Sequence, residues 1–129
     1  MIALDTNVLI RYIAQDGGDQ ARIATQIIEG QLTEANLGYV SLPVVCELVW
    51  ALQTRYKRTR DEVRNTVALL LSAAQLEIEK ADLIRSALSD NRADIADAII
   101  HALGIAKGCS HTVTFDKKFA RLGGVELLQ

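Results

Sequence analysis

Proline, cysteine and aromatic residues are scarce in this sequence. The chain holds one proline, two cysteines, one tryptophan, three tyrosines and two phenylalanines, while half of its residues are hydrophobic. Such a composition excludes a disordered or proline-rich extended chain. Cys46 and Cys109 have apolar neighbours and no cysteine or histidine partner at metal-ligand spacing. We therefore expect neither a disulfide nor a zinc site, and we expect both thiols to be buried and reduced.

Long hydrophobic runs and a basic amino-terminal segment are also missing. The longest apolar stretches, such as 67–71, fall far short of the roughly 20 residues that a membrane helix needs. We expect a protein that is neither exported nor embedded in a membrane, and hence a cytoplasmic one. The net charge of −2 argues against coating of nucleic acid by bulk charge, although a local basic patch can still bind phosphates. The length of 129 residues predicts a single domain, 1–129.

The apolar patterns predict strands that alternate with helices. The first five residues, MIALD, form a short apolar run that ends in an acid and leads into a helical pattern, NVLIRYIA. Further strands are expected at 39–42, 76–79, 111–114 and 125–128, and further helices at 19–29, 43–54, 60–73, 80–89 and 91–107, with a helical turn at 116–121. This alternation is typical of βαβ units. The predicted fold class is therefore α/β, a three-layer α/β/α sandwich with a central, mostly parallel sheet.

Four acids stand out because their neighbours are apolar. They are Asp5 in LDTNVL, Glu47 in VCELVWAL, Asp97 in DIADAIIHAL and Asp116 in VTFDKKF. Asp5 and Asp116 directly follow predicted strands, and ligands of parallel sheets bind beyond the carboxyl ends of the strands. A carboxylate at the edge of a core is costly unless a base or a cation pairs with it, and these segments hold few obvious basic partners, with Arg11 one or two turns from Asp5 on the same predicted helix.

A hard divalent ion satisfies several carboxylates at once. Mg²⁺ and Mn²⁺ prefer oxygen ligands, which suits a set of Asp and Glu without His or Cys. Such an ion polarises a phosphate oxygen and activates a water, so the predicted chemistry is hydrolysis of phosphodiester bonds. Thr6, Asn7 and Thr114 stand beside these acids in sequence and are predicted to support the site through hydrogen bonds.

Each acid also has a structural interpretation. Asp5 and Asp116 can be helix caps, and Glu47 and Asp97 can pair with an arginine. Asp94 stands three residues before Asp97, and a cap or dipole role is favoured for it over metal ligation. For the two histidines, His101 and His111, we favour partners inside the fold over a catalytic role.

The four acidic segments together resemble the PIN-domain nucleases, and among them the VapC-type toxins of toxin-antitoxin pairs. LDTNVLIRYI resembles the first motif of that family, SLPVVCELVWAL the second, DIADAIIHALG the third and VTFDKKFARL the last. The resemblance assigns the metal-ligand positions to Asp5, Glu47, Asp97 and Asp116. It implies a PIN-like sandwich, dependence on Mg²⁺ or Mn²⁺, endonucleolytic cutting of RNA, a homodimer and inhibition by a cognate antitoxin protein.

Binding of RNA needs positive charge near the acids. TRYKRTR supplies one cluster, and Lys117, Lys118 and Arg121 supply a second after Asp116. If these side chains contact backbone phosphates, they do so without reading base sequence. The residues predicted to bind RNA are Arg11, Arg55, Lys57, Arg58, Arg60 and Lys117.

Two rival functions fit parts of the pattern. A haloacid-dehalogenase-type phosphohydrolase also begins with a strand that ends in Asp, but it needs a second acid two residues later, where this chain has Asn7. A non-catalytic interaction module on a PIN-like scaffold is the other alternative. The presence of all four acids weighs against it.

Overall fold

The computed structural model describes residues 1–129, which group into two compact units, Met1–Ala81 and Asp82–Gln129. In the first unit the strands β1, β2 and β3 pair in parallel in that order, with Ile2 opposite Gly38 and Gly38 opposite Leu76. Its elements are β1 Ile2–Ala3, α1 Thr6–Ala14, α2 Gly18–Thr25, a π-helix Gln26–Gln31, β2 Gly38–Val40, α3 Leu42–Thr54, α4 Arg60–Ser72 and β3 Leu76–Ile78.

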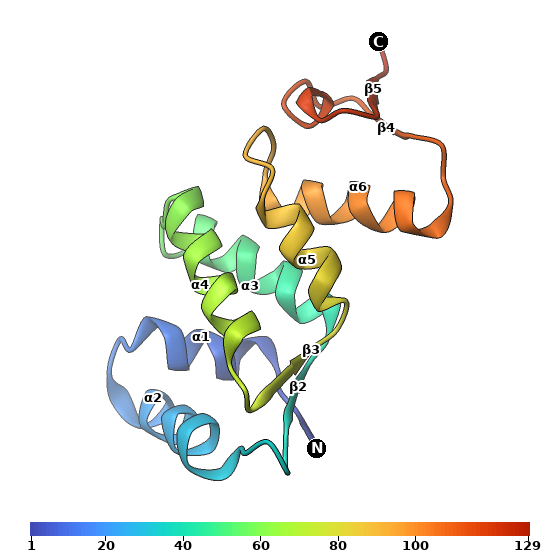
Figure 1. The fold of residues 1–129 in the computed structure, drawn as a ribbon. Coiled ribbons are helices and arrows are strands. Elements are labelled where there is room, and N and C mark those ends of the chain that lie inside the picture. Colours follow the sequence, from blue (N-terminus) through green and yellow to red (C-terminus); the bar gives the residue numbers. More distant parts are fainter. The chain divides into compact units, whose positions relative to one another are not determined.

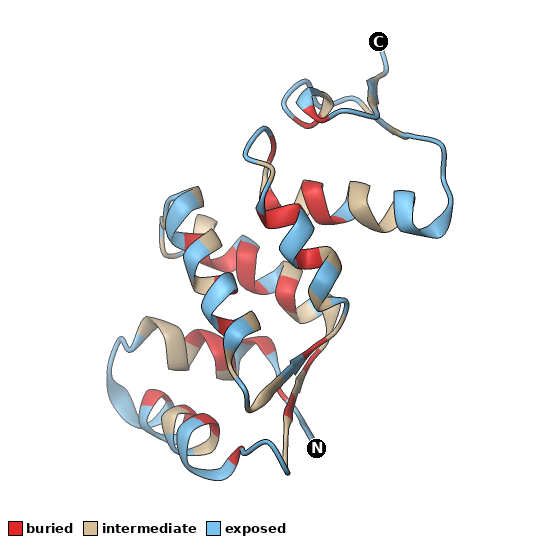
Figure 2. Ribbon diagram, in the orientation of Figure 1, coloured by how far each residue is buried: buried red, intermediate tan, exposed pale blue.

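Helix packing builds the core of the first unit. Figure 1 shows α1 to α4 gathered on one side of the three-stranded sheet, and α1 packs against α2 and α3. Figure 2 shows buried positions on the helices and along β2. The side chains that are fully buried there include Leu9, Ile28, Val40, Leu48, Leu52, Val63 and Val67. Burial of such side chains is the main source of stability in a domain of this size.

Local signals fix where the helices start. Thr59 and Glu62 form a capping box, because the Thr59 hydroxyl accepts from the Glu62 N–H at 3.2 Å and the Glu62 carboxylate accepts from the Thr59 N–H at 2.8 Å. Pro43 stands in the first turn of α3, as expected from its missing N–H. These signals set the starts of α4 and α3.

Gly38 in β2 is the tightest glycine position in the chain. A Cβ atom there would lie 2.6 Å from Leu32 Cδ1 and 3.0 Å from both Leu4 Cδ1 and Leu76 Cδ2. Gly38→Ala is therefore expected to lower the free energy of unfolding by about 1–3 kcal/mol, measured by chemical denaturation. Gly30→Ala is the matched control, because nothing lies within 4 Å of its added Cβ. Equal stability of the two variants would contradict the expectation.

The second unit carries two helices and a small parallel sheet. Its elements are α5 Ala81–Leu88, α6 Ile95–Lys107, β4 Thr112–Thr114, a 3₁₀ helix Phe119–Arg121 and β5 Val125–Leu127. β4 and β5 pair in parallel, with Val113 opposite Glu126. A hydrogen bond of 2.8 Å joins His101 Nδ1 on α6 to Thr112 Oγ1 on β4, so this histidine has a partner inside the fold.

The predicted α/β class with parallel strands is confirmed, and most element bounds agree with the sequence patterns to within a few residues. One helix start was wrong. The sequence predicted a helix from residue 91, but α6 begins at Ile95. Before it, the Asp90 carboxylate accepts hydrogen bonds from the backbone and the guanidinium of Arg92, and this local turn competes with helix formation.

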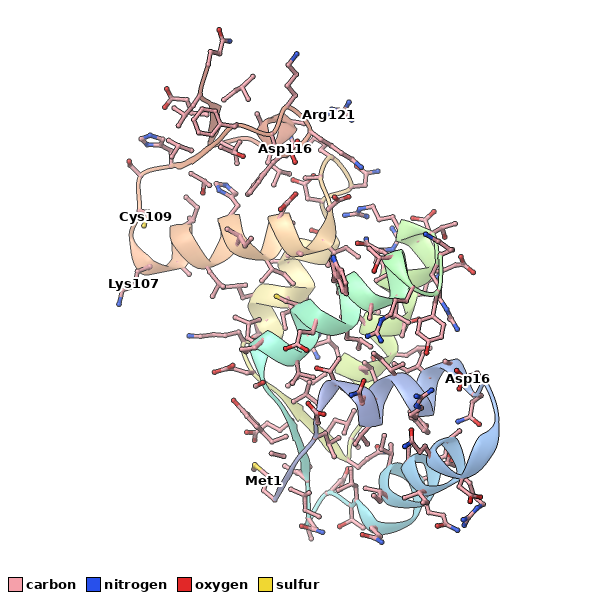
Figure 3. All side chains as sticks on the ribbon, turned by 180° about the vertical axis from the view of Figure 1, so that it is seen from behind. Met1, Asp16, Lys107, Cys109, Asp116 and Arg121 are labelled. Atoms are coloured by element: carbon pink, nitrogen blue, oxygen red, sulfur yellow. The ribbon has the colours of Figure 1, made fainter.

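The prediction for the cysteines was wrong in part. Both are free, and Cys46 is half-buried, where burial raises the pKa of its thiol. Cys109 is exposed, because α6 ends at Lys107 and the chain turns at Gly108, with a φ of 105°, before Cys109 (Figure 3). No helix in the structure combines the length and the apolar character that crossing a membrane requires.

Candidate functional site

Asp5 occupies the junction between β1 and α1. Its backbone has φ −79° and ψ 158°, and its carbonyl accepts hydrogen bonds from the N–H groups of Val8 and Leu9. It therefore stands at the N-cap position, but its side chain makes no capping hydrogen bond. The carboxylate is exposed and free for another partner. A cap role alone does not account for this acid.

Glu47 lies on α3 and is linked to the start of α1. The Thr6 hydroxyl donates a hydrogen bond to Glu47 Oε2 at 3.2 Å, across 41 positions of sequence. Thr6 is the one buried polar residue of the chain, with 5% of its surface exposed. Glu47 itself is exposed between the buried Leu48 and Val45. Thr6, which directly follows Asp5 in the chain, thus fixes the direction of the Glu47 carboxylate.

The structural alternative for Glu47 was an ion pair with an arginine. The ion pairs of the chain are distributed over other acids, and neither Asp5 nor Glu47 takes part in one. Asp5 and Glu47 therefore present carboxylates that the first unit leaves unneutralised.

Asp97 is the third residue of α6 and is half-buried. Burial raises the pKa of its carboxyl, the negative charges of Asp94 and Asp116 raise it further, and the Lys118 ammonium opposes them. Asp94, Asp97 and Asp116 are thus close enough in the second unit to repel one another. A cation placed among them would relieve that repulsion.

Asp94 precedes α6 at the N-cap position, as predicted, but its side chain makes no capping hydrogen bond. Instead its Oδ1 accepts a charged hydrogen bond from Lys118 Nζ at 3.2 Å. The prediction that the Asp94 side chain caps α6 through a hydrogen bond is therefore wrong, because this carboxylate pairs with Lys118. Sequence reasoning grouped Lys118 with a basic cluster and did not foresee this pair, which spans 24 positions.

Asp116 stands in the loop between β4 and the 3₁₀ helix (Figure 3). Its Oδ1 accepts from the N–H groups of Lys118 at 2.8 Å and Phe119 at 3.4 Å, while its own N–H donates to Thr114 Oγ1 at 3.0 Å. The prediction that Asp116 caps the helical turn that follows it is confirmed for Oδ1. The second oxygen, Oδ2, makes no hydrogen bond within the protein and is free to bind a ligand.

The predicted RNA-binding residues occupy different surroundings. Arg11 is held by Gln20 and Asp16, and it lines a cavity together with Arg55. Lys57 adopts a left-handed backbone, with φ 53°, in the link between α3 and α4. The remaining predicted cations are Arg58 in the same link, Arg60 at the start of α4 and the exposed Lys117.

The histidines have partners inside the fold. His101 bonds to Thr112, and His111 lies between Ser110 Oγ at 2.8 Å and Glu126 Oε2 at 3.3 Å. The structural interpretation of His101 and His111 is confirmed. No catalytic role has to be assigned to either ring.

Neither unit by itself brings three His, Cys, Asp or Glu side chains into a group that could hold a metal ion. The chemistry of the donors nevertheless suits Mg²⁺ or Mn²⁺, since every candidate ligand is a carboxylate. Burial, and then the charges of Asp94 and Asp116, raise the pKa of Asp97, so a bound cation would favour its ionised form. The residues present therefore fit a hard divalent cation.

Comparison with known proteins identifies the family. The sequence model of the PIN domain matches residues 2–125. The chain belongs to the PIN-domain family. This PIN domain is also 26% identical over 128 residues to a VapC ribonuclease of Aquifex aeolicus (strain VF5), an alignment that covers 95% of this chain and 93% of the relative. The resemblance inferred from four short motifs is confirmed, and the match extends across the sequence of both units.

The crowding around Asp97 predicts an effect on stability in the metal-free PIN domain. Because the folded-state pKa is raised, the charge on Asp97 costs free energy at neutral pH, and the cost vanishes below the ordinary pKa of an aspartate. In chelator at pH 7, Asp97→Asn is expected to unfold at a higher temperature than the wild type, with a difference that shrinks as the pH falls. Asp82→Asn is the control. A lower midpoint for Asp97→Asn at pH 7 would refute this interpretation.

Proposed function

We propose that this PIN domain is a Mg²⁺- or Mn²⁺-dependent endoribonuclease, the toxin component of a VapBC-type pair. The observation that carries the proposal is the state of Asp5 and Glu47. In a member of the PIN family these motif acids are exposed and without a basic partner, and Thr6 donates a hydrogen bond to Glu47. The name of the Aquifex relative, a VapC ribonuclease, supports RNA as the substrate.

The proposed metal ligands are Asp5, Glu47, Asp97 and Asp116, with Asp94 as a supporting acid. We propose that residues 1–129 act as a single PIN domain. The family match from 2 to 125 supports this proposal. When bound, Mg²⁺ or Mn²⁺ supplies Lewis-acid polarisation of the phosphate and lowers the pKa of a water.

The chain's own residues prepare this chemistry. Thr6 holds the Glu47 carboxylate at 3.2 Å, and Thr114 accepts from the Asp116 N–H, which fixes the loop that carries this acid. Asn7 follows in the first turn of α1 and has a free side-chain amide for a water or a phosphate oxygen. Such supporting contacts orient ligands and are worth about 10- to 100-fold in metal affinity or activity.

Positive side chains are proposed to bind the RNA backbone. Each contact of this kind neutralises a phosphate and gives affinity that falls with salt. The residues proposed for this role are Arg11, Arg55, Lys57, Arg58, Arg60 and Lys117. We further propose a homodimer in the cytoplasm that a cognate antitoxin protein inhibits.

The test is RNA cutting by the purified protein. The proposal predicts that a structured RNA pool is cut internally in Mg²⁺ or Mn²⁺ and stays intact in chelator. In cells, expression of the wild type should create new RNA 5′ ends that expression of Asp97→Asn does not create. Cutting that persists in chelator would refute the metal mechanism, and identical 5′ ends from both proteins would refute the ribonuclease.

A further inference from the structure

A cavity of about 570 Å³ in the first unit is lined in part by Arg11 and Arg55, two of the residues proposed above to bind RNA. Val8 of α1, Ile23 and Ala24 of α2 and Ile27 of the π-helix form its apolar part. Ile23 leaves 46% of its surface in solvent, although half of the isoleucines of the chain are buried. A concave surface of this size with exposed apolar side chains is typical of a binding pocket.

The polar groups of the cavity include several that have no partner in the protein. Arg11 is fixed, since its Nε donates to Gln20 Oε1 at 2.9 Å. The side chains of Asn7 and Arg55 line the same cavity and make no hydrogen bond or ion pair, and Gln20 Nε2 is equally free. The cavity therefore combines apolar walls with amide donors and acceptors and two guanidinium groups.

This combination matches the chemistry of a nucleotide. Aliphatic walls pack against the flat face of a base, amides pair with the polar edge of a base, and a guanidinium stacks on a base or binds its phosphate. Asn7 belongs to the lining and stands in the first turn of α1, two positions along the chain from Asp5.

We propose that this cavity binds an unpaired nucleobase of the RNA substrate, next to the phosphate that is cut. The proposal rests on the proposed ribonuclease function and names what that site recognises. The two arginines favour a polyanion, and the free amides favour a base over a purely apolar side chain.

The experiment measures binding separately from cutting. Fluorescence anisotropy in chelator compares short oligo(A) and oligo(U) strands with abasic strands of the same length. Ile23→Ala is expected to weaken binding of the base-containing strands by about fivefold or more and to leave the abasic strands unaffected. Arg55→Ala is expected to weaken binding of both kinds of strand, because it also removes a charge.

Two matched variants control for the loss of apolar surface and for the loss of a positive charge. Leu69→Ala removes an exposed apolar side chain of the same unit outside this cavity, and Arg22→Ala removes a charge from the outer face of α2. Leu69→Ala should bind every strand as the wild type does. Arg22→Ala should weaken binding less than Arg55→Ala.

Equal affinity of the wild type and Ile23→Ala for every base-containing strand would overturn the proposal. Failure of the ribonuclease proposal is distinguishable, because it shows as an absence of metal-dependent cutting by the wild type, whereas these affinities are measured without metal. Ile23 is partly exposed, so the folded state of the variant can be verified by circular dichroism.

Discussion

Asp97→Asn is expected to reduce the rate of RNA cutting in saturating Mg²⁺ by about 100-fold or more. The substitution keeps the size and the polarity of the side chain but removes its charge. A metal-activated water and a polarised phosphate are worth several kcal/mol of barrier, and loss of a ligand forfeits most of this. Asp5→Asn, from the other unit, should give a loss of the same order. The measurement is the initial rate of cutting of one defined RNA.

Asp82→Asn is the control for these variants, since Asp82 is an exposed acid of α5 that pairs only with Arg85. It should cut RNA at the wild-type rate. Thermal unfolding curves show whether each variant is folded. If Asp97→Asn is folded and cuts within a few-fold of the wild type, Asp97 is not a metal ligand.

Glu47→Gln changes a proposed metal ligand and is expected to weaken Mn²⁺ binding and to lower the cutting rate by about 10- to 100-fold. Thr6→Val is expected to lower both by about tenfold, because it removes the hydrogen bond of 3.2 Å from the Thr6 hydroxyl to Glu47 Oε2. Valine has the shape of threonine but cannot donate this bond, so the carboxylate loses its fixed direction. Isothermal titration with Mn²⁺ and the cutting rate measure the two effects.

Thr6→Ser keeps the hydroxyl and serves as the matched control. It should retain Mn²⁺ affinity close to that of the wild type, even though it loses a methyl group from a buried position. If Thr6→Ser and Thr6→Val lose the same affinity, the role of Thr6 is packing, and the hydrogen bond has no part in the site.

The sequence was sufficient for the elements that depend on local patterns. Apolar periodicity located α1, α3 and α4, and strands that end in an acid located Asp5 beside β1 and Asp116 after β4. These features follow from side chains within one or two turns of each other. The family also followed from short segments, because each motif lies inside one element and its flanks.

Features that depend on side-chain partners far apart could not be predicted. The bond from Thr6 to Glu47 joins α1 to α3, and the pair of Lys118 with Asp94 joins a loop to the start of α6. No periodicity encodes such contacts. Two local departures were also missed: the turn that delays α6 until Ile95, and the π-helix Gln26–Gln31, where the sequence predicted one continuous helix from 19 to 29.

The central claim is that the four motif carboxylates, Asp5, Glu47, Asp97 and Asp116, bind the metal on which RNA cutting depends. Titration of the metal-free protein with Mn²⁺ tests this claim most directly, with the wild type, Asp5→Asn and Asp97→Asn compared side by side. The account predicts that each substitution abolishes high-affinity binding of Mn²⁺. Retention of wild-type affinity by either variant would contradict the account.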